Sequence, residues 1–366
     1  MTIKLLLLEG DGIGPEITAA ARTVLTAADA QFGLNLVFET ADIGFTALAA
    51  HGTTIPDAVI AQAKAADGVI LGPVSHNSYP PVEAGGLNPS GVLRKALDRY
   101  ANIRPARTRG GFMGFGGKAI DLVVVRENTE GFYADRNMFM GNGEFMPTPD
   151  VALAVRKVTR EASLRIAASA FELAMTRTKR VTVVHKANVL RVSDGLFLSC
   201  VREVAARYPE VTVEERLVDA MAALLVRDAS AFDVILATNM FGDILSDQAA
   251  ELSGSLGLAA SLNAGTAHGV AQAQHGSAPD IAGQDKANPA SLIGSAAMLL
   301  QWLSERRGSP SLLRAARSIE NALDAVIATP SGRTADMGGV LGTVRLPSGS
   351  ATSWGKRFKA SAVRLH

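Results

Sequence analysis

A strand, a glycine-rich turn and a helix are predicted at the start of the chain, in the stretch IKLLLLEGDGIGPE at residues 3–16. The apolar run at residues 3–8 is typical of a buried strand, and Pro15 just before the next apolar periodicity is a common helix-start signal. Repeated strand–turn–helix units build α/β proteins around a largely parallel sheet. The opening stretch therefore predicts this fold class.

Short apolar runs continue to alternate with longer amphipathic stretches along most of the chain. Buried strands are predicted at residues 3–8, 68–71, 122–125, 181–184 and 234–237. Helices are predicted at residues 15–32, 56–66, 93–100, 158–175, 195–208, 220–226, 289–305 and 311–328. The stretch 254–288, which is rich in Gly, Ala and Ser, is predicted to be a loop.

The first turn nearly matches the glycine fingerprint of dinucleotide-binding Rossmann folds, G-x-G-x-x-G. Gly10 and Gly12 fit, but Gly14 comes one residue early and is followed by Pro15. Glu39 is only a weak candidate for the acidic residue that would bind the ribose. We therefore do not predict a Rossmann nucleotide site at this turn.

The composition excludes several classes of partner. The 366 residues include 36 Lys+Arg and 35 Asp+Glu, a net charge of +1, which argues against nucleic acid or an acidic membrane as partner. The single cysteine, Cys200, excludes an internal disulfide framework and a zinc site of several cysteines. With no signal peptide or long apolar run, we expect a soluble, cytoplasmic protein in a reducing compartment.

Three arginines lie where an α/β protein places ligand contacts. Arg94 falls in a predicted helix, Arg104 follows that helix, and Arg126 ends the strand predicted at residues 122–125. Guanidinium groups bind carboxylates through paired hydrogen bonds. Taken singly, each arginine is better explained as a member of a surface ion pair, and the sequence alone does not bring the three together.

Two carboxylates predict a metal site. Asp243 and Asp247 are four residues apart at the start of a helix, so they share one face and could bind Mg²⁺ or Mn²⁺. The alternative is that both only favour the positive end of the helix dipole. Lys186 follows the strand predicted at residues 181–184, where it could act as a base near a metal ion.

A loop of small and polar residues at 275–283 could approach a nucleotide closely. Asn288 lies at the far end of this loop.

Together these stretches resemble the β-decarboxylating dehydrogenase family of 3-isopropylmalate, isocitrate, homoisocitrate and tartrate or D-malate dehydrogenases. The overall likeness is nearest to 3-isopropylmalate dehydrogenase. The motifs that carry the resemblance are residues 8–16, 93–105, 126–133, 185–188, 219–220, 239–247 and 275–280.

The resemblance implies a two-domain α/β fold that is not a Rossmann fold. Residues 1–103 and 256–366 would form a large cofactor-binding domain, and residues 104–255 a central domain for dimerisation and metal binding. The stretch 132–149, which breaks the periodicity, falls where the family has an arm that interlocks a homodimer. From its residues alone it is a projecting loop or hairpin, either buried against a partner chain or lying as a surface flap.

The resemblance also implies roles for individual residues. Arg94, Arg104 and Arg126 would hold the carboxylates of a malate-type diacid. The metal ligands would be Asp243, Asp247 and, from the other subunit, Asp219. Lys186, also from the partner, would assist removal of the hydroxyl proton, and Tyr133 would protonate the enol after carbon dioxide leaves.

The implied cofactor is NAD. Its contacts would be Ile13, His275, Gly276, Ser277, Ala278, Pro279, Asp280, Ile281 and Asn288. Family members that use NADP have a lysine and a tyrosine where this chain has Asp280 and Ile281. An aspartate accepts hydrogen bonds from a free ribose hydroxyl and repels a 2′-phosphate.

The substrate is less defined, because the residues before Arg94 depart from both main branches of the family. Asn88 and Ser90 are predicted to bind substrate, and they make a polar substituent at C3 plausible. Ala271-Gln272 replaces a common Phe-Glu, which affects contacts near the nicotinamide.

The predicted activity is oxidative decarboxylation of a 3-substituted malate, with NAD and Mg²⁺ or Mn²⁺. Isopropylmalate is the default substrate, isocitrate or tartrate/D-malate the rival, and a non-catalytic regulatory subunit the alternative of another class.

Overall fold

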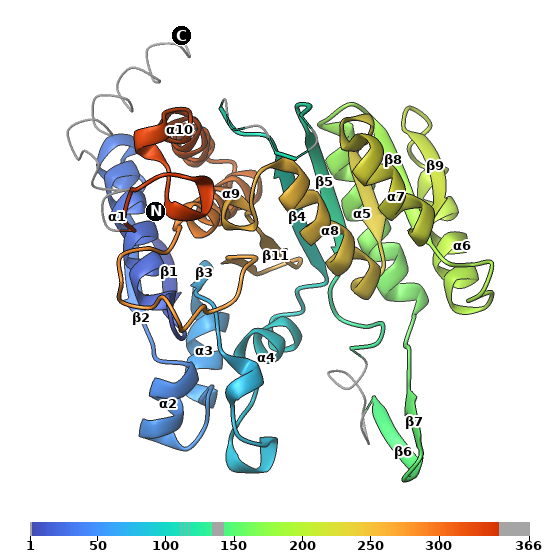
Figure 1. The fold of residues 1–366 in the computed structure, drawn as a ribbon, viewed down its shortest axis with the longest axis horizontal. Coiled ribbons are helices and arrows are strands. Elements are labelled where there is room, and N and C mark those ends of the chain that lie inside the picture. The colour runs from blue at the N-terminus through green and yellow to red at the C-terminus, as the bar shows by residue number, and fades with distance from the viewer. Residues whose placement is uncertain (1, 111, 113, 116, 134–142, 344–366) are drawn as a thin grey trace.

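A ten-stranded sheet runs through the structure (Figure 1). The structure is a computed structural model that describes residues 2–110, 112, 114–115, 117–133 and 143–343, and the sheet is counted over these. The strand order is β2-β1-β3-β12-β11-β4-β5-β10-β8-β9. The strands are β1 (Ile3–Leu8), β2 (Leu36–Thr40), β3 (Gly68–Leu71), β4 (Ala101–Arg107), β5 (Asp121–Glu127), β8 (Arg180–His185), β9 (Thr212–Leu217), β10 (Val234–Ala237), β11 (Leu262–Ala264) and β12 (Gly269–Gln272).

The sheet consists of two parallel groups joined by an antiparallel centre. Strands β2, β1, β3 and β12 are parallel to one another, and so are β5, β10, β8 and β9. Between them, β11 is antiparallel to both β12 and β4, and β4 is antiparallel to β5. The predicted α/β class with parallel pairing is confirmed, and the antiparallel centre brings β4 beside β5.

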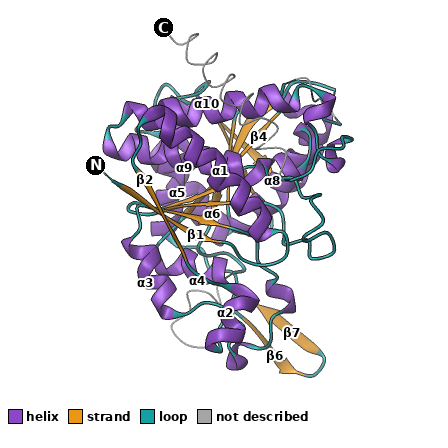
Figure 2. Ribbon diagram, turned by 90° about the vertical axis from the view of Figure 1, so that its left-hand side faces the viewer, coloured by secondary structure: helices purple, strands orange, loops and turns teal. Residues whose placement is uncertain are grey.

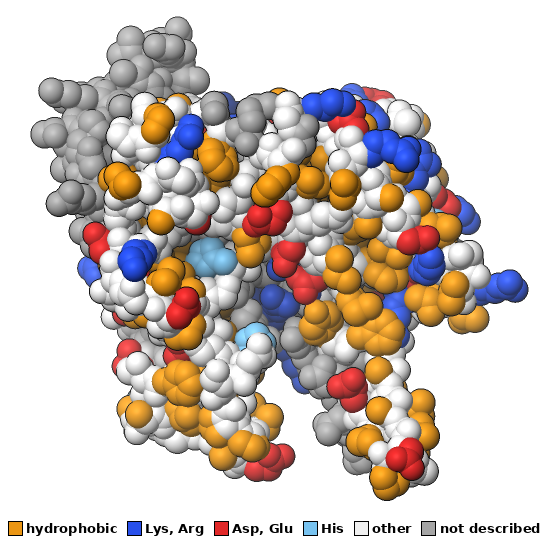
Figure 3. Space-filling view, in the orientation of Figure 1, with side chains coloured by type: hydrophobic (Ala, Val, Ile, Leu, Met, Phe, Trp, Pro, Cys, Tyr) orange, Lys and Arg blue, Asp and Glu red, His pale blue; other side chains and the backbone are white. Residues whose placement is uncertain are grey.

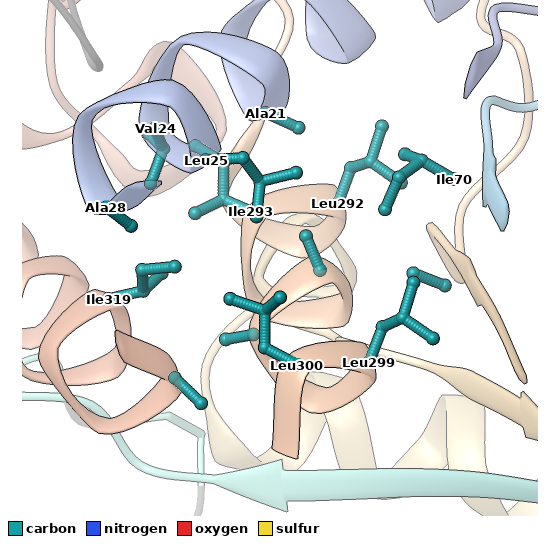
Figure 4. Packing of buried hydrophobic residues seen from close by; sticks show 14 of the residues in the cluster. Ala21, Val24, Leu25, Ala28, Ile70, Leu292, Ile293, Leu299, Leu300 and Ile319 are labelled. Atoms are coloured by element: carbon teal, nitrogen blue, oxygen red, sulfur yellow. The ribbon is translucent and has the colours of Figure 1, made fainter. Parts of the chain in front are cut away.

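Helices cover both faces of this sheet (Figure 2). They are α1 (Gly14–Phe32), α2 (Gly44–His51), α3 (Asp57–Ala65), α4 (Pro89–Ala96), α5 (Arg160–Met175), α6 (Ser193–Ala205), α7 (Val218–Asp228), α8 (Asn239–Ser253), α9 (Ala290–Arg307) and α10 (Pro310–Ile327). The largest core packs α1 against α9 and α10, with Leu25, Ile293 and Ile319 among its fully buried members (Figure 4). This core joins the two ends of the described chain, because α1 comes early and α9 and α10 come late.

In the other parallel group, strand β10 is apolar on both faces. In β10, Val234 and Leu236 pack in a cluster with α5 and α6, whereas Ile235 and Ala237 pack in a second cluster with α7 and α8. Successive side chains of a strand point to opposite faces, so a continuous apolar run needs cover on both sides. These clusters contain no residue of α1, α9 or α10. The boundaries 1–103, 104–255 and 256–366 stay predictions, and residue 1 and residues 344–366 lie outside the described part.

A two-stranded hairpin projects from the body of the molecule (Figure 1). Its strands are β6 (Glu144–Thr148) and β7 (Val151–Ala154), and every residue in both is exposed. Exposed apolar side chains on it include Phe145, Met146 and Leu153. The hairpin covers the second half of the predicted arm at 132–149, while residues 134–142 of that arm lie outside the described residues.

Two predicted elements are wrong in detail. The helix expected at residues 93–100 is α4, which starts earlier because Asn88 caps it and Pro89 occupies its first turn; it ends before Asp98, whose φ is +43°. The loop expected at 254–288 contains β11 and β12, which are too short and too rich in small residues to show an apolar period. Over the described residues, no helix combines the length and the apolar character needed to cross a membrane.

Candidate active site

A cavity of about 340 Å³ opens beside α4, α8 and the ends of β5 and β12. In Figure 3 the molecule is hollowed between its two lower lobes, and basic side chains show in the depth of the hollow. Its lining includes eight of the residues predicted from the sequence. They are Asn88, Ser90, Arg94, Arg104, Arg126, Tyr133, Asp243 and Asp247, and the first two residues of the predicted cofactor loop, His275 and Gly276, line it as well.

The antiparallel centre of the sheet brings the buried arginines together. Asn102 on β4 pairs with Arg126 on β5, so Arg104, two residues along β4, lies on the same face as Arg126. Both side chains are almost fully buried, at 9% and 2% exposure. Arg94 reaches the same cavity from α4. The fold thus brings the three arginines to one cavity, which the sequence alone could not predict.

Helix α8 supplies the acids that face these arginines. Asp243 and Asp247 lie one turn apart, and the Nη1 atom of Arg104 is 3.0 Å from Oδ1 of Asp243 and 3.2 Å from Oδ1 of Asp247. Arg126 also donates to Asp243, and the Tyr133 hydroxyl donates to Oδ2 of Asp243 at 3.1 Å. Tyr133, Asp243 and the arginines therefore form one hydrogen-bonded cluster.

Charge is unevenly distributed in this cluster. Burial raises the pKa of Asp243, but the charges of Arg126 and Arg104 outweigh it and hold that pKa below its usual value. Burial and the repulsion of Arg126 lower the pKa of Arg104 to about 10, despite both aspartates. Arg104 is still charged at neutral pH, and the cavity lining contains three arginines, Arg94, Arg104 and Arg126, but only two aspartates among the described residues. Such a site favours the binding of further anions.

The two polar residues predicted to bind substrate form one wall of the cavity. Asn88 caps α4 by accepting a hydrogen bond from the Gly91 N–H at 3.2 Å. Ser90 donates its hydroxyl proton to Oε1 of Gln272 at 3.0 Å. Both residues line the cavity, and both side chains already take part in structural hydrogen bonds.

The predicted cofactor loop packs against the first glycine turn. The Ile13 N–H donates to the Ser277 carbonyl at 2.9 Å, and the hydroxyls of Ser75 and Ser277 are 2.8 Å apart. A Cβ at Gly12 would lie 2.0 Å from the Ser277 oxygen, and the φ of Gly12 is +57°. This glycine therefore serves the close approach of two loops, which explains why the partial Rossmann match is misleading.

The remaining residues of the loop differ in how they are held. Burial lowers the pKa of His275, so its imidazole is neutral at pH 7, and its Nε2 is buried without a hydrogen-bond partner among the described residues. Pro279 and Asp280 are exposed, whereas Ala278 and Ile281 pack partly against the main core. Asn288 is engaged at both ends, with Asp336 at 3.0 Å and the Ala290 N–H at 3.0 Å.

Lys186 and Asp219 lie apart from this cavity. Lys186 follows β8, Asp219 is in the first turn of α7, and the two side chains form an ion pair with each other. Neither is among the residues that line the cavity.

The residues present fit a divalent cation only in part. Carboxylate oxygens are ligands of Mg²⁺ and Mn²⁺, and Asp243 and Asp247 offer such oxygens one turn apart. Within the described ranges, no group of three His, Cys, Asp or Glu side chains is placed to hold a metal ion. A complete site would need a ligand from elsewhere.

Comparison with known proteins agrees with this geometry. A family model described as isocitrate/isopropylmalate dehydrogenase matches residues 4–349. The chain belongs to that family. An isocitrate/homoisocitrate dehydrogenase of Thermus thermophilus is 41% identical over 93% of this chain and 95% of its own. A 3-isopropylmalate dehydrogenase of Saccharolobus solfataricus is 37% identical, over 93% and 96%. The crystal structure of isocitrate dehydrogenase from Methylococcus capsulatus matches with a TM-score of 0.85 and 38% identity, covering 98% of this chain and 100% of that one.

Membership in the isocitrate/isopropylmalate dehydrogenase family confirms the resemblance and the fold predicted from the motifs. The chain is thus a β-decarboxylating dehydrogenase that acts on a hydroxy diacid.

Three polar residues of this dehydrogenase site were not predicted. Asn239 accepts hydrogen bonds from Arg126 at 2.9 and 2.7 Å, Ser246 accepts one from Arg104 at 2.8 Å, and Gln274 donates to Asp247 at 2.6 Å. Asn239 lies two residues after the end of β10, and a polar residue close to a strand end is a signal that could have identified it. Ser246 and Gln274 carry no such local signal.

Proposed function

We propose that this protein catalyses the NAD-dependent oxidative decarboxylation of a 3-substituted malate, assisted by Mg²⁺ or Mn²⁺. The observation that carries the proposal is the convergence of Arg94, Arg104 and Arg126 on a cavity whose facing helix bears Asp243 and Asp247. The two carboxylates of a hydroxy diacid would bind the guanidinium groups of these arginines. The fold also supports a catalytic role over a regulatory one, because the cluster of Tyr133 and the charged residues is intact.

Substrate binding and cation binding are expected to depend on each other. In the structure the arginines bind the aspartates. When substrate carboxylates take over the guanidinium groups, Asp243 and Asp247 lose their counter-charges. Two carboxylates close together are then unfavourable unless a cation replaces the arginines. Binding of the diacid should therefore increase the affinity for the cation, and binding of the cation should increase the affinity for the diacid.

The chain's own residues hold the substrate and manage its protons. A bound NAD would supply the hydride acceptor for substrate C2, and a divalent cation held in part by Asp243 and Asp247 would supply the Lewis acidity that assists loss of carbon dioxide. The Tyr133 hydroxyl donates a hydrogen bond to Asp243, and its proton would be passed to the substrate carbon after decarboxylation. Lys186 of a second copy would take the proton from the substrate hydroxyl.

The assembly we propose is a homodimer with shared active sites. The exposed hairpin carries Phe145, Met146 and Leu153, and Val192 near Lys186 is 88% exposed, so apolar surface is available for a second copy. Lys186 and Asp219 pair with each other and are not among the residues that line the cavity of their own chain. In a dimer, Lys186 and Asp219 of one copy would reach the cavity of the other copy.

Intersubunit complementation tests this assembly. Lys186→Met and Tyr133→Phe should each abolish turnover while diacid binding persists. When the two inactive proteins are unfolded together and refolded, mixed dimers should contain one intact site, and activity should return to about a quarter of the wild-type value. Refolding each variant alone is the control. No recovery in the mixture would mean that both residues act within one chain.

The proposed cofactor is NAD. Asp280 is exposed, and the hydrogen bond given for it among the described residues is to its backbone oxygen, so its carboxylate is available to a ribose hydroxyl. Asp280→Lys combined with Ile281→Tyr should raise kcat/KM with NADP and lower it with NAD. An unchanged preference would contradict the assignment of this loop.

A substrate panel tests the activity itself. NADH formation is followed with Mn²⁺ and, in parallel, 3-isopropylmalate, isocitrate, D-malate and tartrate. Turnover of at least one diacid is expected. A flat trace with all four, together with binding of an effector or of another dehydrogenase, would favour the regulatory alternative. We also propose a reducing, cytoplasmic setting, in which the buried Cys200 would stay a thiol.

A further inference from the structure

Gln272, at the carboxyl end of β12, presents an unused hydrogen-bond donor to the cavity. Its amide oxygen accepts two hydrogen bonds, from the Ser90 hydroxyl at 3.0 Å and from Nδ2 of Asn263 at 3.2 Å. Its amide nitrogen has no partner among the described residues, and it is not enclosed by protein. The NH₂ group is therefore the part of Gln272 that a ligand can reach.

A chain of buried amides fixes this orientation. Nδ2 of Asn128 donates to the backbone carbonyl of Arg99 at 2.9 Å, and a carbonyl can only accept. The same Nδ2 donates to Oδ1 of Asn263 at 2.9 Å, and Asn102 donates to that oxygen at 3.1 Å. Asn263 must then offer its nitrogen to Gln272, which must offer its oxygen in return. Reversing Gln272 would place two donors against each other.

The surroundings of this donor suit an anion. Ser90 and Gly91, in the first turn of α4, line the cavity beside Gln272, and the N-terminus of a helix carries partial positive charge. Arg94 lies one turn further along α4. Val74 is the one branched aliphatic side chain among the described residues that line the cavity. An apolar substituent would therefore leave the amide and the helix terminus without partners, which is costly for buried polar groups.

We propose that Gln272 determines substrate specificity by donating a hydrogen bond to a carboxylate on the C3 substituent. The preferred substrate is then a 2-hydroxy tricarboxylate of the isocitrate type, in place of a malate with an aliphatic substituent. This inference rests on the proposed function. The sequence made isopropylmalate the default substrate, whereas the polar groups on the cavity wall favour isocitrate.

Gln272→Glu is the sharpest test, because it keeps the shape and the acceptor for Ser90 and Asn263. It exchanges the donor for a negatively charged oxygen. We expect kcat/KM for isocitrate to fall at least about tenfold relative to kcat/KM for 3-isopropylmalate, mainly through KM. Gln31→Glu, on the exposed face of α1, is the matched control for the added charge and should leave the ratio unchanged.

Three results would overturn the inference. The wild type could prefer 3-isopropylmalate, Gln272→Glu could lower both activities equally, or it could raise only the KM for NAD, which would mean that the donor faces the cofactor. If the wild type makes no NADH from any diacid, the proposed function fails separately. Calorimetric binding of isocitrate and 3-isopropylmalate to the wild type and to Gln272→Glu then decides the specificity.

Discussion

Two cavities lie at opposite ends of strands β4 and β5, and both contain arginines that face acids. The front cavity is the candidate active site with Arg104 and Arg126. The rear cavity, of about 410 Å³, is lined by Arg107 at the far end of β4, by Asp121 opposite it on β5, and by Arg109. The same residue types thus serve two different purposes on one pair of strands.

The difference lies in how completely each arginine is neutralised. Arg109 is 2.9 Å from both Glu320 and Asp324 of α10, and these acids raise its pKa even though burial lowers it. Arg107 binds the same two acids, at 3.1 and 2.9 Å. At the front, burial prevails and the pKa of Arg104 is lowered. At the rear, the neutralised ion pairs hold β4 against α10. At the front, the incompletely neutralised arginines can bind anionic ligands.

The largest expected effect comes from exchanging matched acids at the two ends. Asp243→Asn removes a proposed metal ligand and should lower kcat/KM by about a thousandfold or more. Asp324→Asn, at the rear, should leave kcat/KM per folded molecule within about threefold, because the rear cluster touches no reacting group. Steady-state kinetics on protein quantified by circular dichroism separates the two. Equal losses would show that the front acid is also merely structural.

A stability comparison of the arginines comes next. Arg109→Met leaves two acids with one arginine in a mostly buried site and should lower the free energy of unfolding by about 4 kcal/mol. Arg104→Met removes an incompletely neutralised charge and should cost less than half of that. Urea unfolding monitored by circular dichroism measures both. A larger cost at Arg104 than at Arg109 would reverse the distinction between the two cavities.

The smallest effect concerns pH and a buried acid, Glu130, which forms no ion pair with an arginine among the described residues. Glu130 accepts hydrogen bonds from the N–H and hydroxyl of Thr159, at 2.7 and 2.9 Å, and burial, reinforced by the charge of Glu127, raises its pKa to about 7. Between pH 4.5 and 7 the folded state keeps a proton that the unfolded state has released. This group's contribution to stability therefore falls as the pH rises through that window, by up to about 3 kcal/mol.

Glu130→Gln mimics the protonated acid and should remove this part of the pH dependence. Thermal midpoints at pH 5 and pH 7.5 should then differ less in the variant than in the wild type. An unchanged difference would assign the pH dependence to other groups.

The sequence predicts the local features of this molecule well. Arg126, Asp243 and Asp247, which line one cavity, could be chosen as candidates because a strand end or a helical spacing is a property of a few neighbouring residues. The core strand β10 could be predicted because its four residues form a continuous apolar run.

What the sequence cannot provide is pairing between distant segments. Arg104 lies beside Arg126 only because β4 is antiparallel to β5, and Pro105 within β4 obscures it as a strand. Ser90 and Gln272, 182 residues apart, meet through the insertion of β12 beside β3. The direction of the Gln272 amide depends on Asn128 and Asn263, and no local pattern encodes it.

The position of β12 in the sheet has a consequence for synthesis. Strand β3 is made early, but its neighbour β12 and the helices that cover α1 are about 200 residues further along, a delay of about 10–40 s at usual translation rates. Strands β5, β8, β9 and β10 form an uninterrupted segment that can be completed first. We therefore expect β3 to have an unpaired edge until β12 has been synthesised. During that time chaperones, or the already folded middle of the chain, would protect this edge.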